Sequence, residues 1–351
     1  MERIFDVIAA IQPTDANARQ QASTRQEQLT KPAGSMGRLE ELAIQIAGIT
    51  GQVTPEITRK AVIVMAADHG VAIEGVSAYP AEVTPQMVLN FLQGGAAINA
   101  LARQANAEVT IVDIGVASEL KHPKLRSHKI AFGTRNMLKQ PAMTPEQAKT
   151  AIETGINVAE ELIAQGVNLL ATGDMGIGNT TASSAITAVL THTPVAEVTG
   201  RGTGISDEQL AHKASIIEAA IAHNQPDPEQ PLDVLAKVGG LEIAGLVGVI
   251  LGGAARRIPV IIDGFISGAA ALVAVGLNPA VREYLIAGHV SQERGHKRIL
   301  EHLQLAPLLD LHLRLGEGTG AVLAMGIVEG ALRVHSEMAT FAEAGVSNRE
   351  D

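Results

Sequence analysis

The sequence predicts an α/β fold in which a mostly parallel sheet is covered by helices on both faces. Short apolar segments alternate with longer stretches of helical periodicity, as parallel strands alternate with crossover helices. Hydrophobic residues make up 46% of the 351 residues and aromatic residues only 2%. The core must therefore be aliphatic, which is typical of sheets that helices bury on both sides.

Six segments are expected to form strands, and most of them end in acidic residues or glycines. They are Ala61–Ala67, Glu108–Ile114, Asn168–Thr172, Pro259–Ile262, Tyr284–Ala287 and Leu311–Leu315. Helical patterns fill the intervals over Pro85–Gln104, Pro145–Gln165, Thr180–Leu190, Ile243–Ala255, Ser267–Val275 and Gly320–Val334. Open α/β sheets bind ligands beyond the carboxyl ends of their strands, so we expect a site at that edge.

Residues 1–50 carry helical periodicity, interrupted by the loop Lys31–Arg38 with one proline and two glycines. This loop is either a connector between two helices or a basic, glycine-rich arm that reaches a ligand or a neighbouring subunit. The spacing alone favours the connector.

The composition argues against several functional classes. The net charge of −10 disfavours a broad nucleic-acid-binding surface. No apolar stretch free of breakers reaches membrane length, and the first residues lack the basic start of a signal peptide. Cysteine is absent, which excludes disulfides, thiol nucleophiles and cysteine-based metal sites. We expect a cytoplasmic protein without a metal or a cofactor.

The stretch Leu311–Ala321 carries the strongest candidate for a reactive group. Glu317 stands between Gly316 and Gly318, just before a helical segment of small residues. Glycines let backbone N–H groups approach a ligand closely, and the start of a helix offers unpaired N–H groups. The turn therefore suits either a bound anion or one reactive acid, and Glu317 is the residue we favour.

Two further glycine-rich turns are candidates for binding phosphate. Gly173–Thr181 could cradle an oxyanion with backbone N–H groups and the Thr180 hydroxyl, although a simple helix cap would give the same pattern. It lacks the lysine of nucleoside-triphosphate P-loops. Thr199–Gly204 is the second turn, and Lys213 could supply positive charge to the same anion. The alternative for Lys213, favoured when that residue is taken alone, is a solvated helix face.

Two acidic strand ends allow more than one interpretation. Asp68 and His69 suggest a metal, but adjacent positions converge poorly on one ion and no third ligand is evident. No metal site is therefore expected. Asp263 follows another predicted strand and could accept hydrogen bonds from ribose hydroxyls.

Five motifs together resemble one enzyme family. They are ADHGV at 67–71, EGVSAYP at 74–80, GDMGIGNTT at 173–181, GRGTG at 200–204 and RLGEGTGA at 314–321, with KPAGSMGRLE at 31–40 in addition. In this order they resemble the nicotinate-nucleotide–dimethylbenzimidazole phosphoribosyltransferases, which assemble the lower nucleotide loop of cobalamin. The resemblance spans nearly the whole chain. It departs at Asp174, where the family motif has Glu, which is one methylene longer.

The resemblance implies a fold, an assembly and a reaction. A Rossmann-like large domain would occupy residues 51–330, and a small helical domain would combine residues 1–50 with 331–351. The protein would be a homodimer. It would transfer the phosphoribosyl group of nicotinate mononucleotide to 5,6-dimethylbenzimidazole, giving α-ribazole 5′-phosphate and nicotinate.

The resemblance also implies roles for individual residues. Glu317 would be the general base, and Asp174 and Lys213 would be further catalytic residues. The benzimidazole would bind among side chains of two separate motifs, namely Ser77, Tyr79, Gln86 and Leu315. The rest of the substrate-binding set comprises Gly176, Gly178, Thr180 and Gly202 for phosphate, Asp263 for ribose, and Arg314.

Two other classes of protein would use the same residues. A nucleotide-binding regulatory module would need the glycine turns but no acid at position 317. A nicotinate-nucleotide hydrolase would use Glu317 or Asp174 to activate water, and it would release nicotinate without any benzimidazole present.

Overall fold

A six-stranded sheet forms the centre of the structure, a computed structural model that describes residues 2–202 and 204–347. Neighbouring strands are all parallel, in the order β3-β2-β1-β4-β5-β6. The strands are β1 (Lys60–Ala67), β2 (Ala107–Gly115), β3 (Arg126–Ser127), β4 (Leu169–Met175), β5 (Val260–Ile262) and β6 (Leu285–Ala287). This is the order of doubly wound Rossmann sheets, in which ligands bind where the order reverses, here between β1 and β4. The predicted α/β fold is confirmed.

Five of the six predicted strands are present, and the sixth prediction is wrong. Leu311–Leu315 is irregular, because the backbone turns left-handed at His312 (φ 55°). Leu311 and Leu315 are 52% and 57% exposed, so their alternation with polar residues does not mark a buried face. The edge strand β3 is not predicted, because two residues carry no periodicity.

Helices cover both faces of the sheet, as predicted. One core joins the sheet to α1 (Glu2–Ala10), α6 (Pro145–Ala164), α7 (Asn179–Thr191), α10 (Pro231–Val238), α11 (Leu241–Ala255), α12 (Phe265–Leu277) and α13 (Arg294–Leu303). The other joins it to α3 (Arg38–Thr50), α4 (Val83–Gln93), α5 (Ala97–Gln104) and α14 (Thr319–Glu337). In β1, Ile63 and Met65 belong to the first core, and Val62 and Val64 to the second. This alternation is the period of two expected for a strand buried on both sides.

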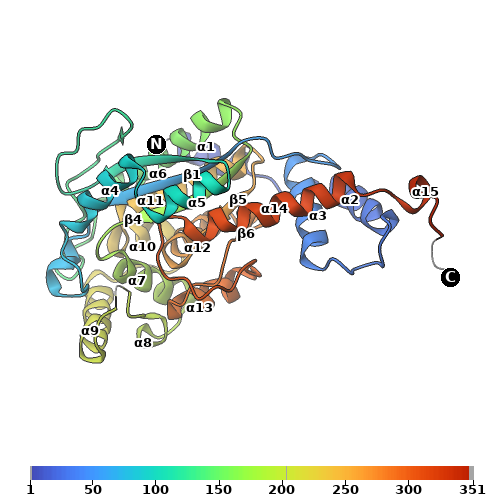
Figure 1. Ribbon diagram of the computed structural model, residues 1–351. Helices are drawn as coiled ribbons and strands as arrows, with labels where there is room; N and C mark the ends of the chain where they lie inside the picture. Colours follow the sequence, from blue (N-terminus) through green and yellow to red (C-terminus); the bar gives the residue numbers. More distant parts are fainter. Residues whose placement is uncertain (1, 203, 348–351) are drawn as a thin grey trace.

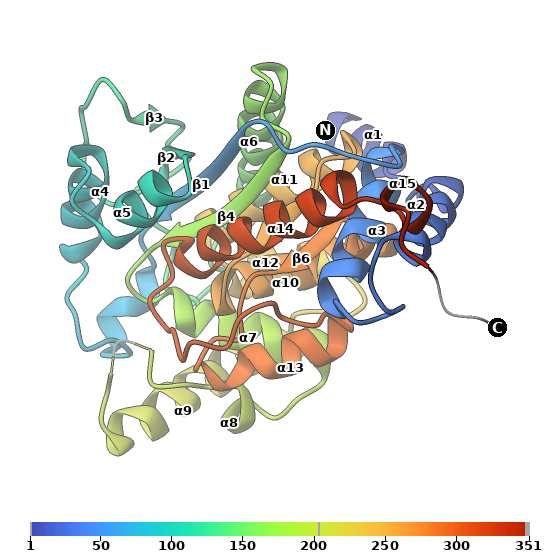
Figure 2. The same ribbon diagram turned by 45° about the vertical axis from the view of Figure 1, so that its right-hand side comes forward.

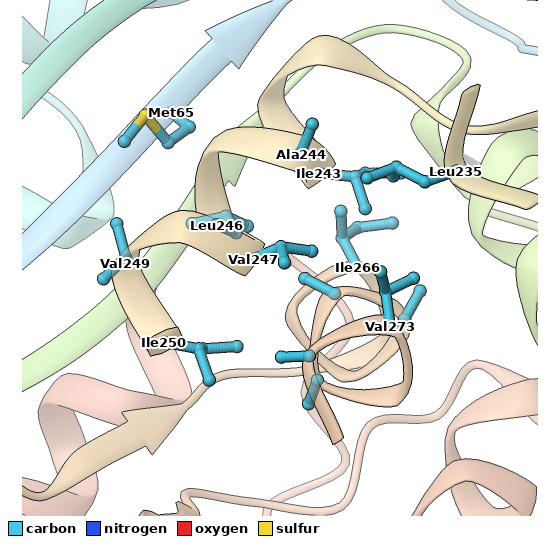
Figure 3. Close-up of a cluster of buried hydrophobic side chains, with 14 of the residues drawn as sticks. Met65, Leu235, Ile243, Ala244, Leu246, Val247, Val249, Ile250, Ile266 and Val273 are labelled. Atoms are coloured by element: carbon cyan, nitrogen blue, oxygen red, sulfur yellow. The ribbon is translucent and has the colours of Figure 1, made fainter. Parts of the chain in front are cut away.

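The aliphatic composition explains how α11 can be enclosed. In Figure 3, Met65 of β1 lies on one side of α11, and Ile266 and Val273 of α12 lie on the other. Gly155 of α6 and Gly248 of α11 let these two helices approach so closely that a Cβ on Gly248 would lie 2.0 Å from Ile152 O. Small residues thus replace aromatic bulk with close backbone packing.

The remaining helical segments are α2 (Ala16–Gln28), α8 (Val195–Val198), α9 (Asp207–Asn224), α15 (Phe341–Ala344) and the 3₁₀ turns η1 (Gly70–Glu74) and η2 (Pro279–Tyr284). The single helix predicted over Pro85–Gln104 is wrong. It is two helices, because Gly94 (φ 83°) adopts the left-handed conformation that ends α4. The loop Lys31–Arg38 connects α2 to α3.

The two chain ends meet in one helical cluster. Figure 1 shows α14 running from the sheet to α2 and α3. Arg25 Nε donates to His335 O at 2.8 Å, and Leu29 forms a β-bridge with Thr340. By contrast α1 packs on α6 and α11, and its Ile4 belongs to the first core. The division into residues 1–50 with 331–351 and residues 51–330 stays a prediction, and 348–351 lie outside the described residues.

In the described chain, no helix is long and apolar enough to cross a membrane.

Candidate active site

Three acidic side chains meet at the carboxyl edge of the sheet. Asp174 lies near the end of β4, Asp263 directly follows β5, and Glu317 lies in the turn before α14. Figure 2 shows the start of α14 next to the carboxyl end of β4. The exposed fractions of these acids are 7%, 0% and 5%. Burying three carboxyls together is unfavourable unless protons or ligands compensate, so the arrangement points to a functional site.

The turn around Glu317 is strained and tightly packed. Glu317 adopts φ 63° between Gly316 (φ 83°) and Gly318 (φ 91°), and a positive φ is uncommon for a residue with a side chain. A Cβ on Gly318 would lie 2.6 Å from Val62 Cγ2, and one on Gly173 would lie 2.5 Å from Glu317 O. The glycines therefore let the turn rest directly on β1 and β4.

The Glu317 carboxylate points to the start of α5. Its Oε2 accepts a hydrogen bond from Ile98 N at 3.2 Å. Burial raises the pKa of Glu317 above its ordinary value, and the hydrogen bond from Ile98 lowers it only in part. Burial therefore outweighs the helix start that supplies this N–H group. That helix start belongs to α5, not to the helix that follows Glu317 in the chain.

Asp263 binds the same turn through hydrogen bonds to its backbone. Its two oxygens accept from Gly318 N at 3.2 Å and from Ala321 N at 2.9 Å, so the carboxyl group caps α14. Burial raises the pKa of Asp263 to about 7, although these hydrogen bonds act in the opposite direction. The ribose contact predicted for Asp263 stays a prediction, on a carboxyl group whose oxygens already accept backbone N–H groups.

Asp174 lies between the turn and α7. Asn179 Nδ2 donates to Asp174 Oδ2 at 3.0 Å, and a Cβ on Gly316 would lie 3.1 Å from the same oxygen. Burial, and then the negative charges of Asp263 and Glu242, raise the pKa of Asp174 well above its ordinary value. A neutral Asp174 beside an ionised Glu317 is the arrangement that repulsion between the acids favours.

A cationic corner forms where the two predicted phosphate turns meet. Lys213 Nζ donates to Thr180 Oγ1 at 2.7 Å, and Arg314 Nη1 donates to Gly202 O at 3.1 Å. A Cβ on Gly202 would lie 3.3 Å from Lys213 Nζ. Burial lowers the pKa of Lys213 to about 8. The solvated helix face considered for Lys213 is therefore wrong, since its side chain is fully buried. Thr203 of the second turn lies outside the described residues.

Glu293 belongs to this corner and is not predicted from the sequence. Its side chain is 7% exposed, and in the described structure its Oε2 lacks a hydrogen-bond partner. Burial raises the pKa of Glu293, while the charge of Lys213 lowers it in part. A Cβ on Gly200 would lie 1.9 Å from Glu293 Oε2, so the second turn lies against this carboxylate. The sequence around Glu293 is polar and carries no motif that could have singled it out.

Asp68 and His69 lie directly after β1 and pack beside the first phosphate turn. His69 Nε2 lies 2.7 Å from Glu242 Oε1 in a fully buried pair, and Ala117 N donates to Asp68 Oδ2 at 2.7 Å. Burial alone would lower the pKa of His69, but Glu242 raises it above its ordinary value. A Cβ on Gly178 would lie 3.1 Å from His69 Cβ, so this pair supports the first phosphate turn. Glu242 is a second residue that sequence reasoning missed.

Comparisons with known proteins agree on one family. Residues 11–346 match the sequence profile of a family described as phosphoribosyltransferase. The nicotinate-nucleotide–dimethylbenzimidazole phosphoribosyltransferase of Chloroflexus aggregans is 62% identical over 352 residues, covering 100% of both chains. The protein of the same name from Geobacter sulfurreducens is 56% identical over 348 residues, covering 99% of each. This chain belongs to the nicotinate-nucleotide–dimethylbenzimidazole phosphoribosyltransferase family.

The fold agrees with that of a solved structure. CobT from Thermus thermophilus superposes with a TM-score of 0.92 at 51% identity, covering 95% of this chain and 100% of that chain. The protein is thus a phosphoribosyltransferase-type enzyme with the fold that the resemblance implied.

In this phosphoribosyltransferase the predicted site residues fall into three groups. Glu317, Asp174 and Asp263 form the buried acidic group. The cationic corner and the turns beside it contain Gly176, Gly178, Thr180, Gly202, Lys213 and Arg314. The residues predicted for the benzimidazole are less enclosed, namely Ser77, Tyr79, Gln86 and Leu315. Tyr79 is 56% exposed and Leu315 is 57% exposed.

Proposed function

We propose that this enzyme transfers the phosphoribosyl group of nicotinate mononucleotide to 5,6-dimethylbenzimidazole, with Glu317 as general base in cobalamin synthesis. The curated relatives carry this activity in their names. The single observation that carries the role of Glu317 is its position: a buried carboxylate of raised pKa in a strained turn at the reversal of strand order. A general base works best when its pKa lies near the operating pH, so burial improves Glu317 as a base.

The chemistry requires one base and no general acid. The nicotinate of the donor is already a pyridinium, so its glycosidic bond can break without protonation. The benzimidazole must lose its ring proton as the other ring nitrogen attacks the anomeric carbon. A carboxylate at about 2.6–3.2 Å from that N–H can take the proton. Attack opposite the leaving nicotinate converts the β-nucleotide into the α-product.

The cationic corner is the proposed phosphate site. Lys213 and Arg314 supply positive charge, and Thr180 and the turn at Gly202 supply hydrogen-bonding groups. Glu293 balances Lys213 in the free enzyme, because its carboxylate lies close enough to shift the pKa of that lysine. On this proposal the phosphate replaces Glu293 as the main counter-ion of Lys213.

The other substrate contacts follow the three groups. The acceptor would lie between Glu317 and the side chains of Ser77, Tyr79, Gln86 and Leu315. Asp263 would contact the ribose, and Asp174 would orient the turn through Asn179 and Gly316. We further propose a cytoplasmic homodimer, which light scattering after size-exclusion chromatography tests directly. Tyr79 and Leu315 are about half exposed, which supports the proposal that a second subunit covers the acceptor side of the site.

The decisive experiment measures nicotinate release from nicotinate mononucleotide with and without 5,6-dimethylbenzimidazole. The parent, Glu317→Gln and the exposed control Glu301→Gln are compared. Release that needs the acceptor and collapses only in Glu317→Gln, with donor binding retained, supports the transferase. Release without acceptor would instead indicate a hydrolase. Donor binding without release, unchanged by Glu317→Gln, would indicate a regulatory module.

A further inference from the structure

A cavity of about 830 Å³ lies away from the acidic edge of the sheet. It is formed where α2, α3, η2, the start of β6 and the end of α13 come together. Leu285, the first residue of β6, lines it, whereas the acids lie at the carboxyl ends of the strands. Its polar lining includes Arg19, Arg38, Gln45, Arg282, Glu283 and Gln304. Its volume is in the range of small-molecule sites.

The cavity contains more guanidinium groups than carboxylates that can pair with them. Arg38 pairs with Glu41 at 2.7 Å, yet its Nε is buried with no hydrogen-bond partner in the described chain. Arg19 Nη1 donates to Thr14 Oγ1 at 3.3 Å, and Arg282 donates to Gln304 Oε1. Within residues 2–202 and 204–347, neither Arg19 nor Arg282 has a carboxylate at ion-pair distance.

The acidic groups of the cavity are already engaged. Glu283 Oε2 accepts from Thr14 N at 2.9 Å and from Thr14 Oγ1 at 2.5 Å. Glu41 is the partner of Arg38. The hydrogen-bonding capacity that remains is therefore that of cationic donors, which match oxyanions in pairs.

We propose that this cavity binds a small metabolite that carries a phosphate or a carboxylate group. Arg19 of α2 and Arg38 at the start of α3 would hold the oxyanion on one side, and Arg282 of η2 would hold it on the other. Gln45 Nε2 already ties α3 to this wall, donating to Glu283 O at 3.1 Å and to Leu285 O at 2.9 Å. The bound anion would add an ionic link between the helical cluster of the chain ends and the edge of the sheet.

The link would also fix the end of the loop Lys31–Arg38, since Arg38 is its last residue. Lys31 at the other end is already held, because its Nζ contacts Glu40 Oε1 at 2.7 Å and is nearly buried. Anion binding at Arg38 would therefore leave this basic loop held at both of its ends.

Titration calorimetry with inorganic phosphate on the full chain tests the inference. The parent is expected to show two classes of site, one at Lys213 and one in the cavity. Lys213→Met should keep the cavity site, and Arg19→Ala/Arg282→Ala should keep the Lys213 site while losing at least tenfold in affinity at the other. The matched control Arg298→Ala, an exposed arginine of α13 outside the cavity lining, should keep both sites.

Titration of Lys213→Met with acetate, alongside phosphate, separates carboxylate from phosphate as the preferred group. Phosphate or acetate should also raise the melting temperature of Lys213→Met by a few degrees, because a ligand of the native state stabilises it. Binding of neither probe to Lys213→Met would overturn the inference. Equal binding to Lys213→Met with and without the two arginine substitutions would overturn it as well. Should the double variant fold poorly, Arg282→Gln alone gives the same comparison. Nicotinate release in the arginine variants stays at the parent rate, so this inference fails or holds separately from the proposed reaction.

Discussion

The two ends of the sheet treat their charged residues in opposite ways. At the carboxyl end Asp174, Asp263 and Glu317 are buried within one site, and burial raises the pKa of each. At the amino end Arg59 and Glu108, beside the starts of β1 and β2, form an ion pair at 3.5 Å with exposed fractions of 50% and 43%. The carboxyl end keeps these three acids where water cannot solvate them, whereas the Arg59–Glu108 pair at the amino end lies in water.

This difference between the two ends shows which charged residues serve function rather than stability. Exposed pairs contribute little to folding, typically about 0–1 kcal/mol. Buried acids of raised pKa oppose folding at neutral pH, because the folded state must either take up protons or bury charge. A sheet edge that retains such acids does so for chemistry or ligand binding. Variants at the two ends of the sheet test this contrast.

Replacing Glu317 should have the largest effect. Glu317→Gln keeps the size of the side chain and the contact to Ile98, but it cannot accept a proton. We expect kcat to fall by about 10²–10⁴-fold, with the KM for nicotinate mononucleotide nearly unchanged. In the parent, kcat should rise with pH through a pKa above the ordinary value of a glutamate, since only the ionised form is a base.

Initial rates between pH 5 and pH 9 measure both predictions. The residual activity of Glu317→Gln should lose this pH dependence. A variant with parent-like kcat would mean that the buried acids do not act as the base.

Replacing Lys213 should reduce donor binding rather than the chemical step. Lys213→Met removes the buried charge of the cationic corner while keeping an apolar stem. We expect kcat/KM for the donor to fall by roughly 10–100-fold, mostly through KM. Because burial lowers the pKa of Lys213 to about 8, the KM of the parent should rise as pH increases past that value.

A KM that stays flat to pH 9.5 in the parent would contradict the assignment of Lys213. Glu293→Gln serves as the paired test. Without the carboxylate that balances Lys213, its donor KM should fall, and the variant should bind inorganic phosphate more tightly than the parent.

Removing one buried acid should stabilise the protein. The pKa of Asp174 is raised on folding, so its favourable contribution is present below its unfolded value and is lost as pH rises through the folded value. Asp174→Asn cannot ionise and can still accept from Asn179. We expect it to be more stable than the parent by roughly 0.5–2 kcal/mol at pH 8, and the difference to shrink toward pH 4.

Urea unfolding at pH 4, 6 and 8 measures this profile, with the exposed Asp310→Asn as the control. A difference between Asp174→Asn and parent that does not change with pH would show that Asp174 does not oppose folding by its charge.

Sequence reasoning predicted which candidate site residues lie at the edge of the sheet, but not the residues that contact them. The ends of β4 and β5 account for Asp174 and Asp263, because parallel strands bring their carboxyl ends to one edge. Glu317 reaches the same edge from the turn before α14, since the strand predicted before it does not form. Glu293 and Glu242 could not be predicted in this way. Glu293 acts on Lys213 and Glu242 acts on His69, and no local sequence pattern encodes such tertiary contacts. The alternation in Leu311–Leu315 is misleading because His312 adopts a left-handed conformation that breaks the extended backbone, and the alternation does not encode that turn.

The smallest effect is expected at the amino end. In a double-mutant cycle of Arg59→Ala and Glu108→Ala, the coupling free energy should be about 0.2–0.5 kcal/mol and should fall as salt increases. The cycle is needed because Arg59 also donates to Gln165 O, and this loss cancels between the two arms. Unfolding by urea at low and high salt gives the value. A coupling free energy above about 1 kcal/mol would contradict the contrast. The exposed ion pair would then stabilise the fold about as much as the buried acids destabilise it.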